Sequence, residues 1–321
     1  MKIAVLLATY NNEKYLSQML SSLLNQSFRD FVCYIRDDGS ADRTVEIARD
    51  YEKNHPDMFR VVYDGFGDRL GAKGNFFSLL KSVEADVYFF ADADDVWSKD
   101  KIKKSILRLD GMESGDKPLC VFTDMYVTDE KLNIIHDSFI RSLDRDPHYL
   151  RYQEIIMDNP AAGCTICFNR ACRDAAVFAD SADGDGLFST VVSQVEMHDV
   201  WVLITAALLG EVDVIDEPLV HYRQHGDNEM GARSESVLQK LTRNIAGFFD
   251  GTLKAKKAAY YNNAKNLARS ALLLHGLSPK DREVLSGFCD MDKLSKPKRI
   301  AFLRDSGFRR KKHSLWIWLW A

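Results

Sequence analysis

The sequence predicts an α/β protein in which a mostly parallel sheet is flanked by helices and followed by a helical C-terminal extension. The first observation is that short apolar runs alternate with helical patterns over roughly the first 110 residues. The second is that polar clusters directly follow three of these runs. The third is a change to a long helical pattern, residues 234–274. A chain of 321 residues, 46% of them hydrophobic, can bury one large core and a smaller appendage.

The predicted elements follow one another in a regular order. The apolar runs predict strands at residues 2–7, 31–35, 60–63 and 87–91. Helical patterns follow these runs at residues 13–26, 44–53, 71–83 and 97–109. Further along, we expect a loop and strand at 159–170, an apolar helix at 202–209 and a strand at 219–222. Ligands of open α/β sheets bind at the carboxyl ends of the strands, so the polar residues there are candidate site residues.

Three carboxylates, Asp92, Asp94 and Asp95, come directly after the fourth predicted strand. Carboxylates this close together cannot all stay ionised without a compensating charge. Mg²⁺ and Mn²⁺ take oxygen ligands and bridge substrate phosphates, so the cluster predicts a divalent cation site. The alternative is an acidic turn that caps the following helix. The polar clusters at 9–11 and 37–40 favour the cation site, because they also end strands of the predicted sheet.

Four segments carry a family resemblance and occur in the family's order, at residues 6–11, 35–44, 71–76 and 90–97. They resemble the motifs of family 2 inverting glycosyltransferases, which have the GT-A fold. The resemblance implies a catalytic domain at 1–228, with a nucleotide-sugar half at about 1–110 and an acceptor half at about 111–228. Residues 229–321 are then a helical C-terminal region. The string from Tyr222 to Asn228 looks most like bacterial rhamnosyltransferases that use dTDP-rhamnose.

The resemblance implies roles for residues on the donor side. Thr9, Tyr10 and Asn11 pack on the nucleobase and ribose, and Asp38 accepts the hydrogen of a pyrimidine N3. A carboxylate acceptor suits uracil or thymine, so the expected donor is a UDP- or dTDP-sugar. The alternative for Asp38 is a turn residue that bonds its own backbone. The other donor-side candidates are Lys73, Asn75, Asp92, Asp94 and Arg223, and the expected ligands of Mg²⁺ or Mn²⁺ are Asp95, Asp94 and His225.

An inverting transfer also needs a base that takes the proton of the acceptor hydroxyl. The resemblance implies Asp199 for this role, with Glu196 as the second choice. The alternative for Asp199 is a helix cap without a catalytic part. The acceptor-binding candidates are Gly163, Cys164, Thr165, His198 and Trp201. Cys164 and Cys167 have the spacing of a metal or redox pair, but no second pair accompanies them, so we expect them to continue a strand.

Composition limits the partners and the compartment. The net charge of −4 argues against a nucleic acid, and six irregularly spaced cysteines indicate reduced thiols in a cytoplasm. No run approaches the length of about 20 apolar residues that a membrane span needs. Residues 296–320 combine eight Lys or Arg with three Trp, which predicts peripheral attachment to an anionic membrane on its inner face. Alternatively, the tryptophans dock on the protein itself or on a second subunit of a homo-oligomer.

Together these features predict a metal-dependent, inverting glycosyltransferase. Its expected donor is a UDP- or dTDP-sugar, with dTDP-rhamnose as one candidate. Its expected acceptor is a glycan or a lipid-linked glycan in bacterial surface polysaccharide synthesis. Two alternatives stay open: a nucleotidyltransferase, which would carry a Gly-rich basic loop after the first strand, and a non-catalytic sugar-binding protein with the same fold.

Overall fold

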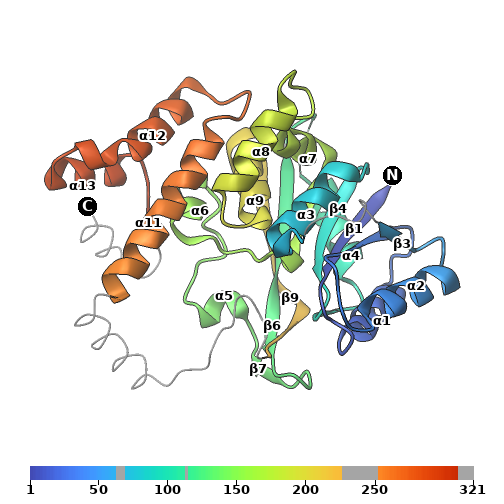
Figure 1. Ribbon diagram of the computed structural model, residues 1–321. Helices are drawn as coiled ribbons and strands as arrows, with labels where there is room; N and C mark the ends of the chain where they lie inside the picture. The colour runs from blue at the N-terminus through green and yellow to red at the C-terminus, as the bar shows by residue number, and fades with distance from the viewer. Residues whose placement is uncertain (63–68, 113–114, 226–251, 310–321) are drawn as a thin grey trace.

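The computed structural model describes residues 1–62, 69–112, 115–225 and 252–309 (Figure 1). In this part of the chain, nine strands form one sheet in the order β3-β2-β1-β4-β8-β6-β9-β5, with β7 paired to β6. The strands are β1 (Ile3–Thr9), β2 (Val32–Asp37), β3 (Phe59–Val62), β4 (Val87–Asp92), β5 (Val96–Trp97), β6 (Leu119–Thr128), β7 (Ile134–His136), β8 (Ile166–Asn169) and β9 (Glu211–Arg223). All four predicted N-terminal strands are present.

The sheet is mixed and mostly parallel, as predicted. β1 is parallel to β2 and β4, β2 is parallel to β3, and β6 is parallel to β9. β8 lies antiparallel between β4 and β6, and β5 is antiparallel to β9. The strand predicted at 219–222 is the end of β9, which has 13 residues. Acidic residues at 211, 213, 216 and 217 interrupt its apolar pattern, so the sequence predicted only the last part.

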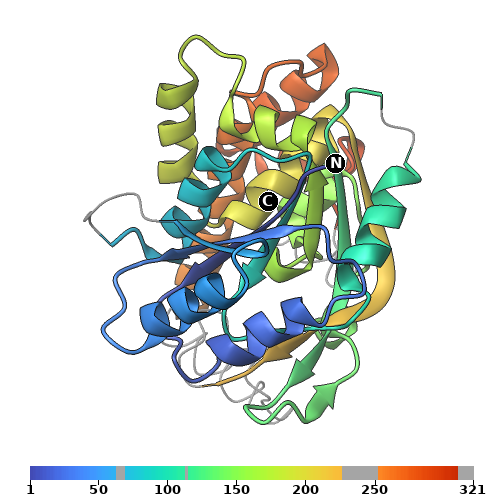
Figure 2. The same ribbon diagram turned by 90° about the vertical axis from the view of Figure 1, so that its right-hand side faces the viewer.

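Helices cover both faces of this sheet. They are α1 (Leu16–Leu24), α2 (Thr44–Asn54), α3 (Gly71–Ser82), α4 (Lys101–Asp110), α5 (Phe139–Ser142), α6 (Tyr152–Asp158), α7 (Arg170–Val177), α8 (Gly184–Gln194), α9 (His198–Leu209), α11 (Thr252–Ala271), α12 (Pro279–Cys289) and α13 (Lys296–Asp305), with 3₁₀ turns η1 (Gly163–Thr165) and η2 (Met291–Lys293). In Figure 2, α3 and α8 lie on one side of the sheet and α4 lies on the other.

The alternation of side chains along β1 explains the two-sided core. Ala4 and Leu6 belong to a cluster with α3, α7 and α9, whereas Val5 and Leu7 belong to a second cluster with α1 and α4. Successive side chains of a strand point to opposite faces, so a strand covered on both faces is apolar throughout. This is why the predicted strands read as unbroken apolar runs.

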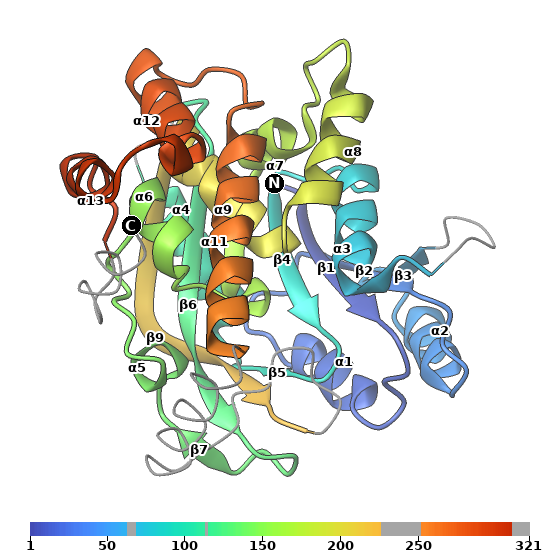
Figure 3. The same ribbon diagram turned by 60° about the vertical axis from the view of Figure 1, so that its left-hand side comes forward.

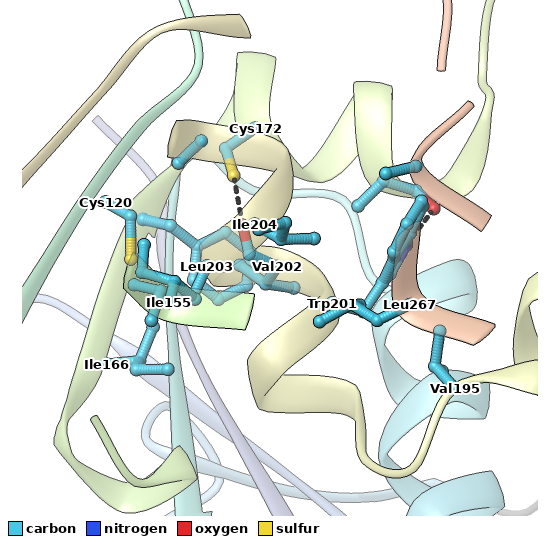
Figure 4. Packing of buried hydrophobic residues seen from close by; sticks show 14 of the residues in the cluster. Cys120, Ile155, Ile166, Cys172, Val195, Trp201, Val202, Leu203, Ile204 and Leu267 are labelled. Carbon is cyan, nitrogen blue, oxygen red and sulfur yellow. Dashed lines mark hydrogen bonds between the residues drawn. The ribbon is translucent and has the colours of Figure 1, made fainter. Parts of the chain in front are cut away.

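The helix α9 is largely buried in the core. Residues Trp201 to Ala206 are all buried, and Figure 4 shows Trp201, Val202, Leu203 and Ile204 packed among neighbouring core side chains. A helix that is apolar on every side is expected in the centre of a core. The helix begins at His198, four residues before the predicted start at 202, and this places Asp199 in its first turn.

The described C-terminal helices pack onto the same core. α11 contacts α6, α8, α9 and α12, and it runs alongside α6 and α9 in Figure 3. Leu267 and Ala268 of α11 are buried, and Phe288 of α12 stacks on Phe308 with ring centroids 4.6 Å apart. The predicted long helix is therefore confirmed over 252–271. Its first part, 234–251, and the tryptophans of 310–321 lie outside the described residues.

Within the described ranges, no single helix is long and apolar enough to cross a membrane. The pair α8 and α9 meets the length and composition criteria together, but the two helices are bent by 119° relative to each other. Much of α9 is buried inside the protein.

Candidate active site

The carboxyl ends of β1, β2 and β4 bring the predicted polar clusters together. Thr9 pairs with Asp37 in the β1–β2 register, and Ala8 pairs with Asp92 in the β1–β4 register. Two segments that are distant in sequence lie at the same edge. One is the end of β9 at Arg223, and the other is η1, which precedes the antiparallel strand β8. The prediction that residues 9–11, 37–40 and 92–95 share one edge of the sheet is confirmed.

Asp95 lies at the centre of the acidic turn and is fully buried. Its Oδ1 accepts a hydrogen bond of 3.1 Å from the backbone N–H of Arg223. Its Oδ2 is buried and accepts no hydrogen bond from an N–H or O–H group of the described residues, and the Cys164 thiol contacts the same carboxyl group. Burial, together with the charges of Asp94 and Asp92, raises the pKa of Asp95 well above its ordinary value. A buried carboxylate oxygen without an N–H or O–H donor is a position where a cation would compensate the charge.

The structure groups three potential metal ligands around Asp95. One ligand atom each from Asp92, Asp95 and Cys164 lies within 4.8 Å of the others. Two hard carboxylate oxygens, one of them without an N–H or O–H donor, fit a divalent cation. This set differs from the predicted one, because it contains Asp92 and Cys164 in place of Asp94 and His225. When bound, such a cation would balance negative charge on a diphosphate.

Asp94 and His225 bond to each other. His225 Nε2 lies 2.8 Å from Asp94 Oδ2, and the imidazole stacks on Tyr15 with centroids 4.8 Å apart. Arg223 lies over the same tyrosine ring at 4.7 Å and donates from Nε to the carbonyl oxygen of Asp94 at 2.8 Å. Metal ligation by Asp94 and His225 stays a prediction.

Arg223 is buried and its guanidinium holds several parts of the site together. Besides Asp94, it donates to the carbonyl oxygen of Glu130 at 2.5 Å and to the side chain of Gln18. Tyr15, Gln18 and Glu130 were not among the residues predicted from the sequence. No local pattern marks them, because β9 and the turn after β6 bring them to Arg223 only in the folded chain. The expected contact of Arg223 with a pyrophosphate stays a prediction.

The loop after β1 is held by the turn after β2. Thr9 Oγ1 donates to Asp37 Oδ1 at 2.9 Å, and the backbone N–H of Asn11 donates to Ser40 Oγ at 2.8 Å. Asn11 has φ of 50°, a left-handed conformation that asparagine tolerates. Tyr10 is 38% exposed, and Arg69 lies over its ring at 3.8 Å. Of the three predicted donor contacts in this loop, Tyr10 has the side chain best placed to stack on a base.

Asp38 has a structural function that neither sequence interpretation included. It accepts hydrogen bonds from the backbone N–H groups of Leu70 and Gly71 at 2.9 and 2.8 Å, and from Arg36 at 3.2 Å. The turn-residue alternative is wrong for Asp38, because Asp37 accepts the N–H groups of Gly39 and Ser40 instead. Asp38 thus fixes the start of α3, and its contact with a pyrimidine stays a prediction.

Asn75 and Lys73, the two donor-side candidates in α3, differ in their surroundings. Asn75 is almost fully buried and accepts a hydrogen bond of 2.9 Å from Arg36, so its expected place on the surface of a donor pocket is wrong. Its Nδ2 also donates to the carbonyl oxygen of Arg36 at 3.2 Å, so Asn75 lies against the end of β2. Lys73 is half-buried, and its Nζ donates to the carbonyl oxygen of Val195 at 3.0 Å. It therefore links α3 to the segment before α9.

Asp199 lies in the first turn of α9, where a carboxylate is favoured by the helix dipole. It accepts from the backbone N–H of Val200 at 2.7 Å, and the backbone of Gly163 also bonds to it. Burial raises the pKa of Asp199 to about 6, and these backbone donors offset part of the rise. A carboxylate with this pKa is largely ionised at neutral pH and is a stronger base than an ordinary aspartate. The N-terminal cap is Met197, so the simple cap alternative is wrong.

Trp201 does not form a surface for a sugar ring, which corrects the prediction. It is fully buried, and its Nε1 donates to the carbonyl oxygen of Ala176 at 2.9 Å, a bond drawn in Figure 4. Asp199 and Trp201 both lie in α9, and residues two positions apart in a helix are about 200° apart around its axis. Trp201 therefore faces the core, while Asp199 faces η1.

His198 and Thr165 are also buried, against the prediction of acceptor contacts. His198 stacks on Phe76 with centroids 3.9 Å apart, and neither ring nitrogen has a hydrogen-bond partner in the described structure. Burial lowers the pKa of His198 to about 3, so the ring is neutral. Thr165 Oγ1 donates to the carbonyl oxygen of Ala162 at 2.7 Å and closes the η1 turn. Of the predicted acceptor residues, Gly163 bonds to Asp199 through its backbone.

Lys101 is a further buried charge near the site that the sequence did not indicate. It is fully buried, and its Nζ lies 4.4 Å from the ring centroid of Trp97 and 5.3 Å from that of Phe89. The described residues offer this ammonium no hydrogen-bond acceptor. Burial lowers the pKa of Lys101 to about 8. The sequence signal for this burial was the helical spacing: Lys101 lies four residues before Ser105, and both are on the buried side of α4.

Comparisons with known proteins identify the family of the chain. The family described as glycosyl transferase family 2 matches residues 4–177. A segment of 105 residues is 36% identical to a dTDP-rhamnosyl transferase RfbG of Shigella flexneri, and it covers 31% of this chain and 35% of that protein. The chain thus spans about a third of the length of this relative.

Solved structures show the same fold at low sequence identity. A crystal structure of S. aureus TarS residues 1–349 in complex with UDP-GlcNAc has a TM-score of 0.55 and 17% identity, covering 95% of this chain and 80% of that chain. The mannosyltransferase PcManGT from Pyrobaculum calidifontis, in complex with GDP-Man and Mn²⁺, has a TM-score of 0.51 and 13% identity, covering 95% and 74%. The expected GT-A fold is confirmed. With its family match over more than half of its length, the chain belongs to glycosyl transferase family 2.

Proposed function

We propose that this chain transfers a sugar from a nucleotide-sugar donor to a hydroxyl group of a glycan, with inversion at the anomeric carbon. The observation that supports this most strongly is the position of η1. Its first residue, Gly163, bonds to Asp199, and its second, Cys164, lies beside Asp92 and Asp95. A base and an acidic cation site thereby lie on two sides of one short turn.

In this mechanism Asp199 removes the proton of the acceptor hydroxyl while that oxygen attacks the anomeric carbon from the face opposite the diphosphate. The raised pKa of Asp199, about 6, suits a base that is ionised at neutral pH yet binds a proton readily. Tyr10 offers an exposed ring for stacking on the nucleobase. Asp92 and Asp95 would hold Mg²⁺ or Mn²⁺. The Mn²⁺ in the PcManGT structure supports such a requirement.

For the donor we propose a UDP- or dTDP-sugar, with dTDP-rhamnose as the first candidate. The name of the Shigella relative, a dTDP-rhamnosyl transferase, supports the dTDP-sugar, and the UDP-GlcNAc complex of TarS supports UDP. For the acceptor we propose a glycan or lipid-linked glycan of a bacterial surface polysaccharide. TarS of Staphylococcus aureus, named as a poly(ribitol-phosphate) β-N-acetylglucosaminyltransferase, supports this class of acceptor.

A donor screen tests the proposal. The purified chain is incubated with UDP-, dTDP- and GDP-sugars and Mn²⁺ or Mg²⁺, and release of the nucleoside diphosphate is measured with and without EDTA. We expect release from one donor group, stopped by EDTA and strongly reduced in Asp199→Asn. The variant Glu196→Gln tests the second choice for the base, an exposed carboxylate three residues earlier, and it should keep the release if Asp199 is the base. Release that continues unchanged in Asp199→Asn contradicts the assigned base.

We also propose that the chain acts at the inner face of the cell membrane, through the basic and Trp-rich residues 296–320. A truncation test must keep α13, because Leu303 and Phe308 are buried and Arg309 pairs with Glu154 at 2.6 Å. A chain ending at Arg309 is therefore compared with the full chain in liposome co-sedimentation. We expect binding to anionic vesicles that depends on the last twelve residues and weakens with salt. Equal sedimentation would favour a protein interface, such as a homo-oligomer.

A further inference from the structure

The cation site contains a sulfur atom that the proposed function does not require. Cys164 Sγ is grouped with carboxylate oxygens of Asp92 and Asp95, all within 4.8 Å of one another. Cys164 and Asp95 are almost completely buried. A further sign of a ligand is Asp95 Oδ2, a buried oxygen to which no N–H or O–H group of the described residues donates, so that the Cys164 thiol is its polar neighbour.

The chain positions this thiol through the closure of η1. The backbone N–H of Thr165 donates to the carbonyl oxygen of Ala162 at 2.9 Å, and the Thr165 hydroxyl donates to the same oxygen. β8 starts directly afterwards and pairs antiparallel with β4, through Cys167 and Phe89. The turn therefore lies beside the end of β4, where Asp92 begins the acidic segment. Cys167 lies outside the ligand group, so the two cysteines do not act as a pair.

The spacing of the three ligand atoms is suitable for one ion. Carboxylate oxygens bind transition-metal ions at about 2.0–2.2 Å and thiolate sulfur binds at about 2.3 Å. Two ligands on opposite sides of such an ion are then roughly 4.5 Å apart and adjacent ligands are closer, so three atoms within 4.8 Å of one another can contact one ion. Mg²⁺ takes oxygen ligands, whereas thiolate ligands favour softer ions.

We propose that Cys164 is a sulfur ligand of the cation site and that it makes the site prefer ions with a high affinity for sulfur, such as Co²⁺ or Zn²⁺, over Mg²⁺. The inference rests on the proposed function, because it concerns the same cation. It adds a ligand and a metal preference to that site. Since Gly163 precedes Cys164 and bonds to Asp199, ligation at Cys164 also fixes the turn that orients the base.

Cobalt spectroscopy of the full chain tests the sulfur ligand directly. Co²⁺ is titrated into the protein with and without UDP or dTDP, and the near-ultraviolet thiolate-to-cobalt charge-transfer absorption is recorded. We expect this absorption in the wild type and in Cys289→Ser, a half-buried cysteine outside the site. We expect it to be lost in Cys164→Ser and in Cys164→Ala. Thermal unfolding shows whether each of the two variants folds. If one of them has a folding defect, the other still tests whether Cys164 is the ligand.

Calorimetry provides the second measurement, the ratio of Co²⁺ to Mg²⁺ affinity. We expect loss of the sulfur ligand to reduce this ratio by about tenfold or more. Charge-transfer absorption that persists in both Cys164 variants, or its absence from cobalt-loaded wild type, overturns the inference. If the wild type lacks this absorption while Asp95→Asn still abolishes cation binding, the carboxylate site of the proposed function stands and the sulfur ligand alone is wrong. If the wild type binds none of these cations, both are wrong.

Discussion

Gly163 and Asp199 are in direct contact through the backbone of one and the carboxylate of the other. A Cβ atom at position 163 would lie 3.6 Å from Asp199 Cβ and 3.1 Å from His198 Nε2. The second distance is tight, and His198 cannot withdraw easily because it is stacked on Phe76. The absence of a side chain at position 163 therefore permits the close approach of η1 to the start of α9.

The first prediction is that Gly163→Ala lowers kcat by about tenfold or more, because a misplacement of the base by a fraction of an ångström is costly. Affinity for the donor nucleotide should stay close to that of the wild type. Steady-state kinetics and nucleotide titration check this. Gly111→Ala is the control, since its added Cβ would have ordinary contacts of 3.4 and 3.5 Å. Equal kcat for both variants would show that η1 does not position the base.

The second prediction concerns pH. Because the pKa of Asp199 is raised to about 6, the base is protonated and inactive below that pH and ionised above it. The transfer rate should rise through about pH 6 and level off. Asp199→Asn should lose roughly 10² to 10⁴-fold in rate and lose this rise. Its stability should not fall, since a carboxylate with a raised pKa destabilises the fold once ionised. An unchanged pH profile in Asp199→Asn would assign the titration to another group.

The third prediction separates packing from acceptor binding at Trp201. Trp201→Phe removes the hydrogen bond to Ala176 and part of a fully buried side chain. We expect the free energy of unfolding to fall by about 1–3 kcal/mol, measured by denaturant titration. The KM for the acceptor should remain near the wild-type value. A large increase in acceptor KM at unchanged stability would restore the sugar-platform interpretation.

The fourth prediction is that Lys101→Met stabilises the protein at neutral pH. The pKa of Lys101 falls from 10.5 to about 8 on folding, so below pH 8 the folded state holds a buried charge at a cost of about 3 kcal/mol. Between these values the unfolded chain binds the proton and the folded chain does not, so wild-type stability rises with pH. The gain from Lys101→Met should therefore shrink towards pH 10.5. Unfolding titrations at both ends of this range check it, and a variant less stable than wild type below pH 8 would show that Lys101 is compensated.

The sequence predicted the parts of the site that are local in the chain. Asp92, Asp94 and Asp95 follow an apolar strand, and parallel strands place such ends at one edge, so their grouping was predictable. The burial of Trp201 was not, because it depends on where α9 starts. A shift of the helix start by a few residues changes which side chains face the core.

Contacts between segments that are distant in the chain could not be predicted from the sequence pattern either. Cys164 reaches Asp95 only because β8 runs antiparallel beside β4, and an isolated Cys-x-x-Cys spacing gives no sign of this. The bonds of Asp38 to Leu70 and Gly71 likewise depend on the path of the chain before α3. The way strands and loops lie together in the folded chain, rather than residue type, determines these partners.

The most direct test of the account compares Asp95→Asn with Asp199→Asn in donor binding and transfer. The account predicts that Asp95→Asn loses the cation-dependent part of nucleotide affinity, measured by calorimetry with and without EDTA. It predicts that Asp199→Asn binds the donor and cation as the wild type does but transfers the sugar at least about 10²-fold more slowly. If both variants bind the nucleotide with unchanged cation dependence and transfer at the wild-type rate, the acidic turn and Asp199 do not form the active site.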